Sequence, residues 1–263
     1  MLTTFAHTSA LFFAFATLLY LGSFISKRKK LWSLAQGALL LGLGVQALGF
    51  ALHFAKVGFP LLQQADEAFL FSGWILAFLY LVLSLKYHLP WLGLFFMPAV
   101  LVLYSLSHFS NEHYAQNVLL FHSPWASIHI VFSFLAFSLF SLTFLMGLLF
   151  LLQEYQLKSK RNFLELEKMP SLELLDLLHF KALRLGFIFL TLGILSGSAW
   201  AKTVKGLYFF NDPRQLWTLV AWLVYLLFLQ VHVRANWRGR RGVLLSLLGF
   251  VVILFTFLEV RHS

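Results

Sequence analysis

Cysteine is absent from the chain of 263 residues, and charged residues are scarce. Without thiols, the sequence excludes a disulfide framework, a thiol redox relay and a metal site built from thiolates. Charged residues make up 11% of the chain, against roughly 25% in soluble domains. Hydrophobic residues make up 60% and aromatic residues 18%. This balance predicts an integral membrane protein.

Eight apolar runs of about 20 residues follow one another, each long enough as a helix to cross a hydrocarbon core of roughly 30 Å. They do not alternate as transmembrane β-strands do. We therefore expect an all-α integral membrane protein with eight transmembrane helices, folded as one polytopic domain over residues 1–263. The first run has no basic region before it and no clear small-residue cleavage site before Lys27, and we expect it to be retained as a helix. The runs lie at about 4–26, 31–54, 67–86, 89–107, 125–153, 182–201, 214–233 and 242–259.

The basic residues are distributed unequally between the loops on the two sides. Most fall on the side of residues 27–30, which the positive-inside rule identifies as cytoplasmic, so both termini are expected outside. The net charge of +10 then reflects topology and contact with anionic lipids, and it does not indicate nucleic-acid binding. We expect a multi-pass protein of the bacterial cytoplasmic membrane. The inner basic residues are Lys27, Arg28, Lys29, Lys30, Lys86, Lys158, Lys160, Arg161, Lys168, Lys181, Arg184, Arg234, Arg238, Arg240 and Arg241; the outer ones are Lys56, Lys202, Lys205, Arg214 and Arg261.

The longest polar insert, residues 154–181, lies on the predicted inner side. Charges alternate there with Leu and Phe, and Ser171 precedes LELLDLL. This pattern predicts a short amphipathic helix on the inner leaflet. The longest outer loop, residues 107–125, carries His108, His113 and His122.

Two of the histidines that lie in or near apolar runs, His129 and His232, are candidates for a function. His129 lies about one turn inside the fifth run, where an ionisable side chain is costly and therefore points to a function. Neutral imidazole is a good axial ligand for haem iron. His232 lies near the inner end of the seventh run, and three roles stay open for it: an inner-side ligand, a proton acceptor, or a side chain among Arg234 and Arg238.

An aromatic cluster surrounds the outer stretch YFFNDPRQLWTLVAW, where Asp212 and Pro213 turn the chain between two apolar runs. Such a cluster is typical of an interfacial aromatic belt. It also suits stacking of a flat macrocycle whose metal is held by histidines of neighbouring helices. The members are Trp200, Tyr208, Phe209, Phe210, Trp217 and Trp222.

The segment from GSAWAKTVKGLYFFNDPRQLWTLVAWLVY to QVHVRANWRGRRG resembles the CcsA/CcmC family, cytochrome c assembly proteins that handle haem through a tryptophan-rich loop. Upstream, GFPLLQQADEAFLFSGW is similar to another family motif, and the resemblance covers about residues 45–260. Two tryptophans of the family loop are replaced here by Phe209 and Asn211. The matching loop positions are Trp200, Ala201, Gly206, Tyr208, Asp212, Pro213, Trp217, Leu219, Trp222, Leu223, Val224, Tyr225, His232, Arg234, Trp237, Arg238, Gly239 and Arg240.

The resemblance implies a protein that binds haem non-covalently and assists c-type cytochrome biogenesis. His129 matches the first of two outer histidine ligands, and His262 is the candidate for the second. The altered loop resembles most the HemX-like and YpjD-like branch. We expect no reaction from the chain alone, because the thioether bond needs cysteines of an apocytochrome. The alternative is a membrane-anchored regulator or scaffold, whose inner basic segment docks a haem-biosynthesis enzyme or another membrane protein.

Topology can be tested with reporter fusions. A reporter fused after Ser263 should be active only outside the cytoplasm, and one inserted near Lys160 only inside, because the basic residues favour that side. The measurement is the paired activity of a periplasmic and a cytoplasmic reporter at each position. The opposite pattern would contradict the placement of the aromatic cluster.

Overall fold

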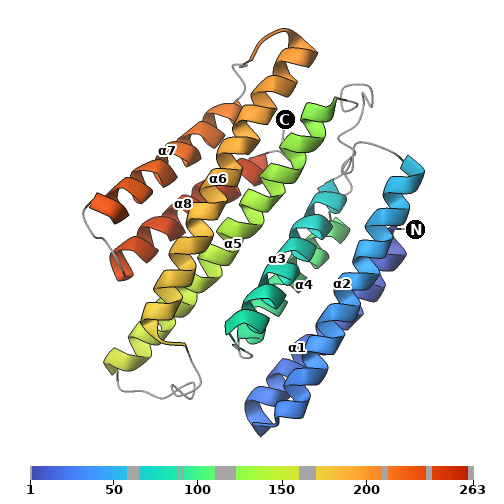
Figure 1. The fold of residues 1–263 in the computed structure, drawn as a ribbon, viewed down its shortest axis with the longest axis vertical. Helices are drawn as coiled ribbons and strands as arrows, with labels where there is room; N and C mark the ends of the chain where they lie inside the picture. The colour runs from blue at the N-terminus through green and yellow to red at the C-terminus, as the bar shows by residue number, and fades with distance from the viewer. Residues whose placement is uncertain are drawn as a thin grey trace. The chain divides into compact units, whose positions relative to one another are not determined.

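The computed structural model describes residues 2–57, 65–87, 89, 92–109, 123–159, 170–208, 213–234 and 239–259. The regular structure of these residues consists of eight α-helices, at the positions of the eight apolar runs (Figure 1). They are α1 (Leu2–Ser26), α2 (Lys29–Val57), α3 (Ala65–Tyr87), α4 (Gly93–Phe109), α5 (Pro124–Ser159), α6 (Leu172–Lys205), α7 (Pro213–Arg234) and α8 (Arg240–Glu259).

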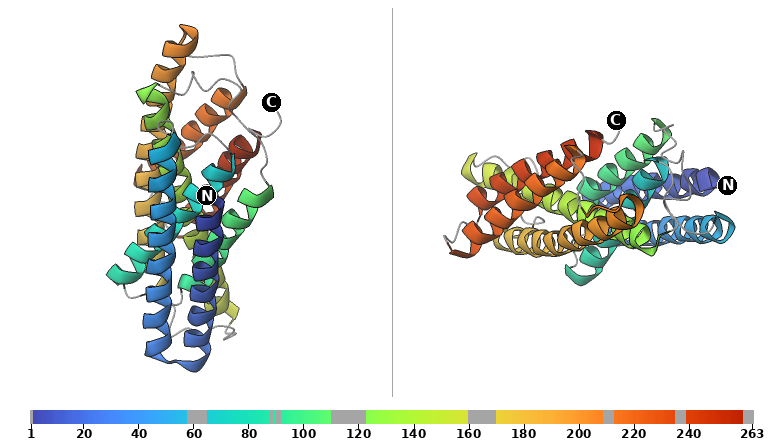
Figure 2. Two further views of the ribbon diagram at one scale, coloured as in Figure 1. Left: turned by 90° about the vertical axis from the view of Figure 1, so that its right-hand side faces the viewer. Right: turned by 90° about the horizontal axis from the view of Figure 1, so that it is seen from above.

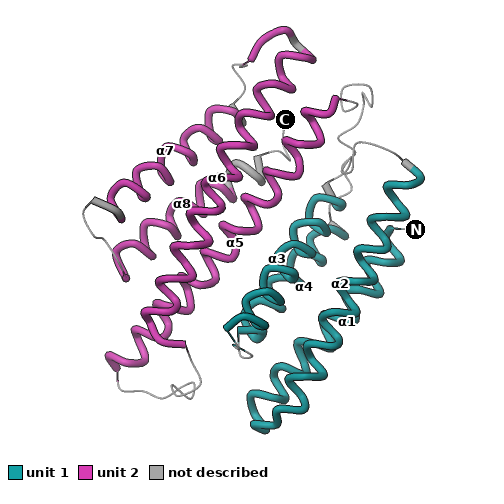
Figure 3. Tube along the Cα trace, in the orientation of Figure 1, with its two compact units in different colours: residues 1–122 teal, residues 123–263 magenta. Residues whose placement is uncertain are grey.

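The helices form two compact units, residues 1–122 (unit 1) and 123–263 (unit 2), coloured separately in Figure 3. Within each unit the helices pack in a ring, because each contacts the next along the chain and the last contacts the first. Each unit is thus a bundle of the up-down-up-down kind. The sequence predicts one polytopic domain over residues 1–263, which would comprise both units; this stays a prediction.

Two glycines of α2 allow α1 to approach closely in unit 1. A Cβ atom at Gly49 would lie 2.6 Å from Cβ of Phe5, and one at Gly42 would lie 2.6 Å from Cε1 of Phe13. The contact partner moves back along α1 as the glycine moves forward along α2, so the two helices are antiparallel. Figure 2 shows this blue hairpin from a second direction.

Polar side chains inside unit 1 bond to one another across helix pairs, as buried polar groups must in an apolar surrounding. The pairs link α1 to α2 and α2 to α3. They therefore fix the register of helices whose apolar surfaces alone would allow sliding. The pairs are Ser9 with Gln46 (2.8 Å), Gln36 with Ser84, and His53 with Glu67 (2.9 Å between Nε2 and Oε1).

The α5–α6 seam of unit 2 is built from glycines that face larger side chains. Three of its contacts are spaced seven residues apart on each helix and run in opposite directions, which is the pattern of an antiparallel coiled-coil pair. The contacts are Gly193 with Ser133, Gly186 with Phe140, and Gly147 with His179; a fourth, Gly197 with His129, lies beyond the first of them.

Within the residues that the structure describes, six helices are long and apolar enough to cross a membrane, and α4 is apolar but shorter; the six are α1, α2, α3, α5, α6 and α7. The all-α membrane fold is confirmed, while the full count of eight spans and the outer position of both termini stay predictions. The amphipathic surface helix expected within residues 154–181 is not separate where the structure describes this segment. Residues 154–159 continue α5 and residues 172–181 begin α6.

The close approach of α1 to Gly49 predicts that two glycine-to-alanine substitutions in α2 differ in their effect on stability. Gly49→Ala should destabilise the α1–α2 pair by about 1–3 kcal/mol, since the added methyl overlaps the Cβ of Phe5. Gly44→Ala is the matched control, because no atom lies within 4 Å of its added Cβ. Unfolding of the purified variants in detergent mixtures measures the difference. Equal stability of the two would refute the close approach.

Candidate functional site

His129 lies in the second turn of α5, at the end of unit 2 that the charge distribution predicts to be outside. We call this the outer end and the opposite one the inner end. Pro124 occupies the first helical position, where its fixed φ fits and its missing N–H needs no acceptor. The N–H of Ala126 then donates to the carbonyl of Ser123 at 3.0 Å, which closes the first turn. This short lead-in holds His129 one turn below the helix start.

The imidazole of His129 is held against α6 by three residues. Its Nδ1 lies 2.7 Å from the carbonyl oxygen of Gly193. A Cβ at Gly197 would lie 2.7 Å from Nδ1 and 2.9 Å from Cε1, so the ring lies directly on the bare backbone of α6. The indole of Trp200 stacks beside it, with ring centroids 6.1 Å apart and planes 28° apart. Of the predicted site residues, His129 and Trp200 are thus brought together.

Trp222 of α7 packs against a different face of α6 from the one that holds His129. Its Nε1 donates to Thr191 Oγ1 at 2.9 Å, and its ring stacks on Phe187 with centroids 5.5 Å apart. Thr191 in turn donates to the carbonyl of Phe187, so its hydroxyl is used in both directions. The described contacts of Trp222 therefore join α7 to α6.

Tyr208 follows the end of α6, where Gly206 takes a left-handed conformation (φ 74°) and its N–H donates to the carbonyl of Lys202. The ammonium of Lys202 lies over the Tyr208 ring, 4.1 Å from its centroid, and donates to its hydroxyl. Tyr208 is 58% exposed and Trp217 is 37% exposed. These two rings are accessible to a bound molecule, whereas Trp222 is engaged between helices.

Four predicted site residues lie outside the described part of the chain. They are Phe209, Phe210 and Asp212 of the aromatic loop, and His262 near the carboxy terminus. Their roles stay predictions.

His232 lies near the inner end of unit 2 and is buried. Its ring stacks on Phe180 of α6 with centroids 3.7 Å apart and planes 17° apart. A second buried histidine, His179, lies on the same helix as Phe180, and its Nε2 is 2.7 Å from the hydroxyl of Ser246 on α8. His232 and His129 thus lie at opposite ends of unit 2, so one site formed by both is excluded.

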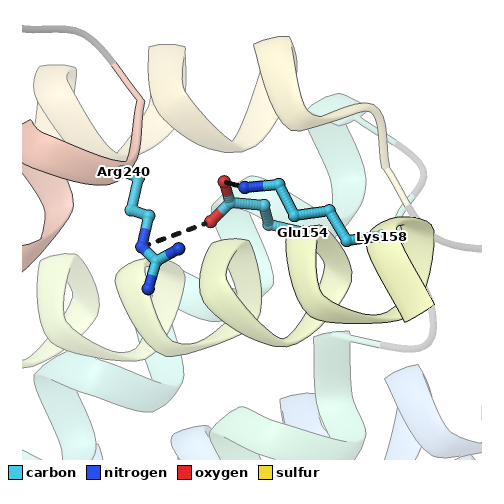
Figure 4. A network of polar contacts seen from close by, with 3 residues as sticks. All are labelled: Glu154, Lys158 and Arg240. Atoms are coloured by element: carbon cyan, nitrogen blue, oxygen red, sulfur yellow. Dashed lines mark hydrogen bonds and ion pairs between the residues drawn. The ribbon is translucent and has the colours of Figure 1, made fainter.

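Charged contacts fasten the start of α8 at the inner end. Glu154 of α5 pairs with Lys158 at 2.6 Å and with Arg240 at 3.9 Å, as Figure 4 shows. Asp176 of α6 accepts a hydrogen bond from the N–H of Gly239 at 3.0 Å. These contacts tie Gly239 and Arg240 to α6 and α5, respectively.

Sequence reasoning found Trp200 but missed Gly193 and Gly197, the other two residues of α6 that hold His129. The available signal was the spacing of Gly186, Gly193 and Gly197, which lie seven and then four positions apart. Small residues at such spacing are typical of membrane helices that pack closely.

Comparisons with known proteins agree with this architecture. The sequence matches the profile of a family described as Cytochrome C assembly protein over residues 62–263. The chain belongs to the cytochrome c assembly family. Its altered aromatic loop is therefore a variation within that family.

The similar relatives are named cytochrome c biogenesis protein CcsA. The protein of Guillardia theta is 28% identical, with 92% of this chain and 87% of that one covered. The protein of Marchantia polymorpha is 24% identical, with 97% and 93% covered. The protein of Chlamydomonas reinhardtii is 29% identical, and the match covers 80% of this chain and 60% of that one. These comparisons give no support to the placement near the HemX-like and YpjD-like branch.

A solved structure, the cytochrome c haem lyase CcmF, shares the fold. Its TM-score is 0.66 at 15% identity, with 98% of this chain and 46% of that chain covered. The present chain thus spans about half the length of that protein. At this identity the likeness concerns the fold alone.

The Trp222–Thr191 contact predicts an effect on the stability of the protein. Trp222→Phe should lower the free energy of unfolding by about 0.5–1.5 kcal/mol, because the Thr191 hydroxyl loses its donor while stacking on Phe187 is kept. Combining it with Thr191→Val should cost less than the sum of the single changes. Denaturant unfolding of the four proteins measures this coupling. Fully additive costs would contradict the hydrogen bond.

Proposed function

We propose that the chain binds haem non-covalently at the outer end of unit 2, with His129 as an axial ligand, and assists c-type cytochrome assembly. The observation that carries this proposal is the contact between His129 Nδ1 and the Gly193 carbonyl. A carbonyl only accepts, so Nδ1 carries the proton and the neutral ring has its lone pair on Nε2. A histidine held in this way fits an iron ligand, since ligating histidines commonly donate their other N–H to a carbonyl. Membership of the cytochrome c assembly family supports the choice of haem.

The outer aromatic residues are proposed to shelter the macrocycle. Trp200 stacks beside His129, and Tyr208 and Trp217 offer exposed rings on the same end of unit 2. Phe209, Phe210 and Asp212 belong to the same loop in the sequence. Haem supplies a planar apolar surface and an iron that accepts nitrogen ligands. Trp222 contributes through the packing of α7 on α6, which positions the loop between them.

The second ligand is proposed to be His262, and His232 is proposed to serve a separate inner position. The membrane arrangement proposed here has eight spans, both termini outside and an inner surface that contacts anionic lipids through its basic residues. CcsA relatives include proteins of eukaryotes such as Chlamydomonas reinhardtii, so the bacterial cytoplasmic membrane stays a prediction.

The proposed partners are haem and other cytochrome c assembly proteins, together with an apocytochrome that supplies the cysteines this chain lacks. The role of His129 and its neighbours is to bind and orient haem. The regulator or scaffold alternative, which includes docking of a haem-biosynthesis enzyme, is not favoured by the comparisons, since the matching proteins are named for cytochrome c assembly.

Visible spectroscopy of the purified protein with added haem tests the proposal. The unmodified protein should give a low-spin bis-histidine spectrum, and His129→Ala should abolish or convert it, because one iron–nitrogen bond is lost. Added imidazole should partly restore it by filling the vacated ligand position. His7→Ala is the control, since His7 is an exposed histidine of unit 1 that stacks on His108. A normal bis-histidine spectrum from His129→Ala would refute the proposal.

The same spectra identify the second ligand. His262→Ala should have the same effect as His129→Ala. If His262→Ala has no effect while His113→Ala or His122→Ala gives that change, the ligand comes from the 107–125 loop instead.

A further inference from the structure

We propose that α6 positions the ligand histidine: the Gly193 carbonyl holds the Nδ1 proton of His129, and Gly197 leaves the space in which the ring must lie. This inference rests on the proposed role of His129 in haem binding. It assigns Gly193, Gly197 and Ser196 as positioning residues, which act on the iron through the imidazole without touching haem.

The hydrogen bond between His129 Nδ1 and the Gly193 carbonyl fixes the orientation of the imidazole. The Nδ1–O separation of 2.7 Å is short for a neutral N–H to carbonyl contact and leaves no room for an intervening water. The acceptor belongs to the backbone of a helix of 34 residues and cannot rotate away. The bond therefore sets the tautomer and the direction of the ring together, whereas a side-chain acceptor would allow either to change.

The absence of a side chain at Gly197 leaves the space that the His129 ring occupies. An added Cβ would lie 2.7 Å from Nδ1, 2.9 Å from Cε1 and 3.4 Å from Cγ of His129. These are ring atoms, and the ring is also limited by the indole of Trp200. A methyl group at this position must therefore displace the imidazole and lengthen its bond to Gly193.

Ser196 is buried, and its hydroxyl also contacts the Gly193 carbonyl that accepts from His129. Its hydroxyl has one hydrogen, which it shares between the carbonyl oxygens of Leu192 at 2.7 Å and Gly193 at 3.0 Å. A second donor on the Gly193 oxygen weakens that oxygen as an acceptor for His129. Removing the hydroxyl should strengthen the His129 bond, make the imidazole a stronger electron donor and favour the oxidised iron.

The main experiment compares two alanine substitutions in the same seam. Gly197→Ala should weaken haem binding by about 10–100-fold and change the low-spin spectrum, as loss of ligand support commonly does. Gly186→Ala is the matched control, because its added Cβ meets Phe140 at 3.0 Å and no histidine. It should destabilise the seam but leave the spectrum unchanged. Unaltered affinity and spectrum in Gly197→Ala would overturn the inference.

Two further measurements cover the case in which Gly197→Ala does not fold. Nitrogen NMR of histidine-labelled, haem-free protein should show His129 protonated at Nδ1, with the signal assigned by its loss in His129→Gln. Ser196→Ala should lower the reduction potential of the bound haem without changing its spectral type. Protonation at Nε2 would overturn the assignment of Gly193, and an unchanged or raised potential would overturn that of Ser196.

The outcomes separate this inference from the proposed function. If His129→Ala loses the low-spin spectrum while Gly197→Ala keeps both spectrum and affinity, His129 is a ligand and α6 does not position it. If His129→Ala keeps the spectrum, the proposed function itself fails.

Discussion

Close contact between α5 and α6 is the constraint on which the rest of unit 2 depends. Glycines set seven residues apart allow the two backbones to approach, and each glycine faces a larger side chain of the opposite helix. The largest of these side chains, Phe140, and both imidazoles, His129 and His179, lie in this seam. Membrane helices gain little from apolar burial against each other, since lipid is equally apolar, so such shape matching carries much of the association.

The distance along the α5–α6 seam between its two histidines is close to the thickness of the hydrocarbon core of a membrane. Gly147, which faces His179, lies eighteen residues beyond His129 on α5, or about 27 Å at the rise of an α-helix. The two imidazoles are thus separated by roughly the thickness of a hydrocarbon core. His129 bonds to a backbone carbonyl and lies near the helix start, whereas His179 bonds to Ser246 within the bundle. Their surroundings differ, since His129 lies near a helix start beside the indole of Trp200, whereas His179 lies edge-on to the ring of Phe228.

Membership of the cytochrome c assembly family and the altered loop are compatible for a physical reason. In the sequence, Phe209 and Asn211 stand where the family has tryptophans; Phe209 keeps an aromatic face of the kind that stacks on a flat ligand, whereas Asn211 does not. Trp200 and Tyr208 match the family loop in sequence. Trp200 lies in α6, three residues after Gly197, and Tyr208 follows the end of that helix. The described contacts of His129 with α6 are made by Gly193, Gly197 and Trp200.

The sequence by itself determined the membrane class, the all-α fold and the eight helices, because long apolar runs have few other stable arrangements in a lipid bilayer. It also singled out His129, since an ionisable residue in such a run is costly. Only the tertiary structure decided what the side chain of His129 bonds to. The Gly193 carbonyl is 64 residues away in sequence, and no local pattern around His129 indicates which helix lies beside it. In the same way, the aromatic cluster reads as one group in sequence, yet Trp200 of α6 stacks beside His129 of α5, whereas Trp222 of α7 bonds to Thr191 on another face of α6. Successive residues of α6 point in directions 100° apart, so Trp200 and Thr191 meet different neighbouring helices.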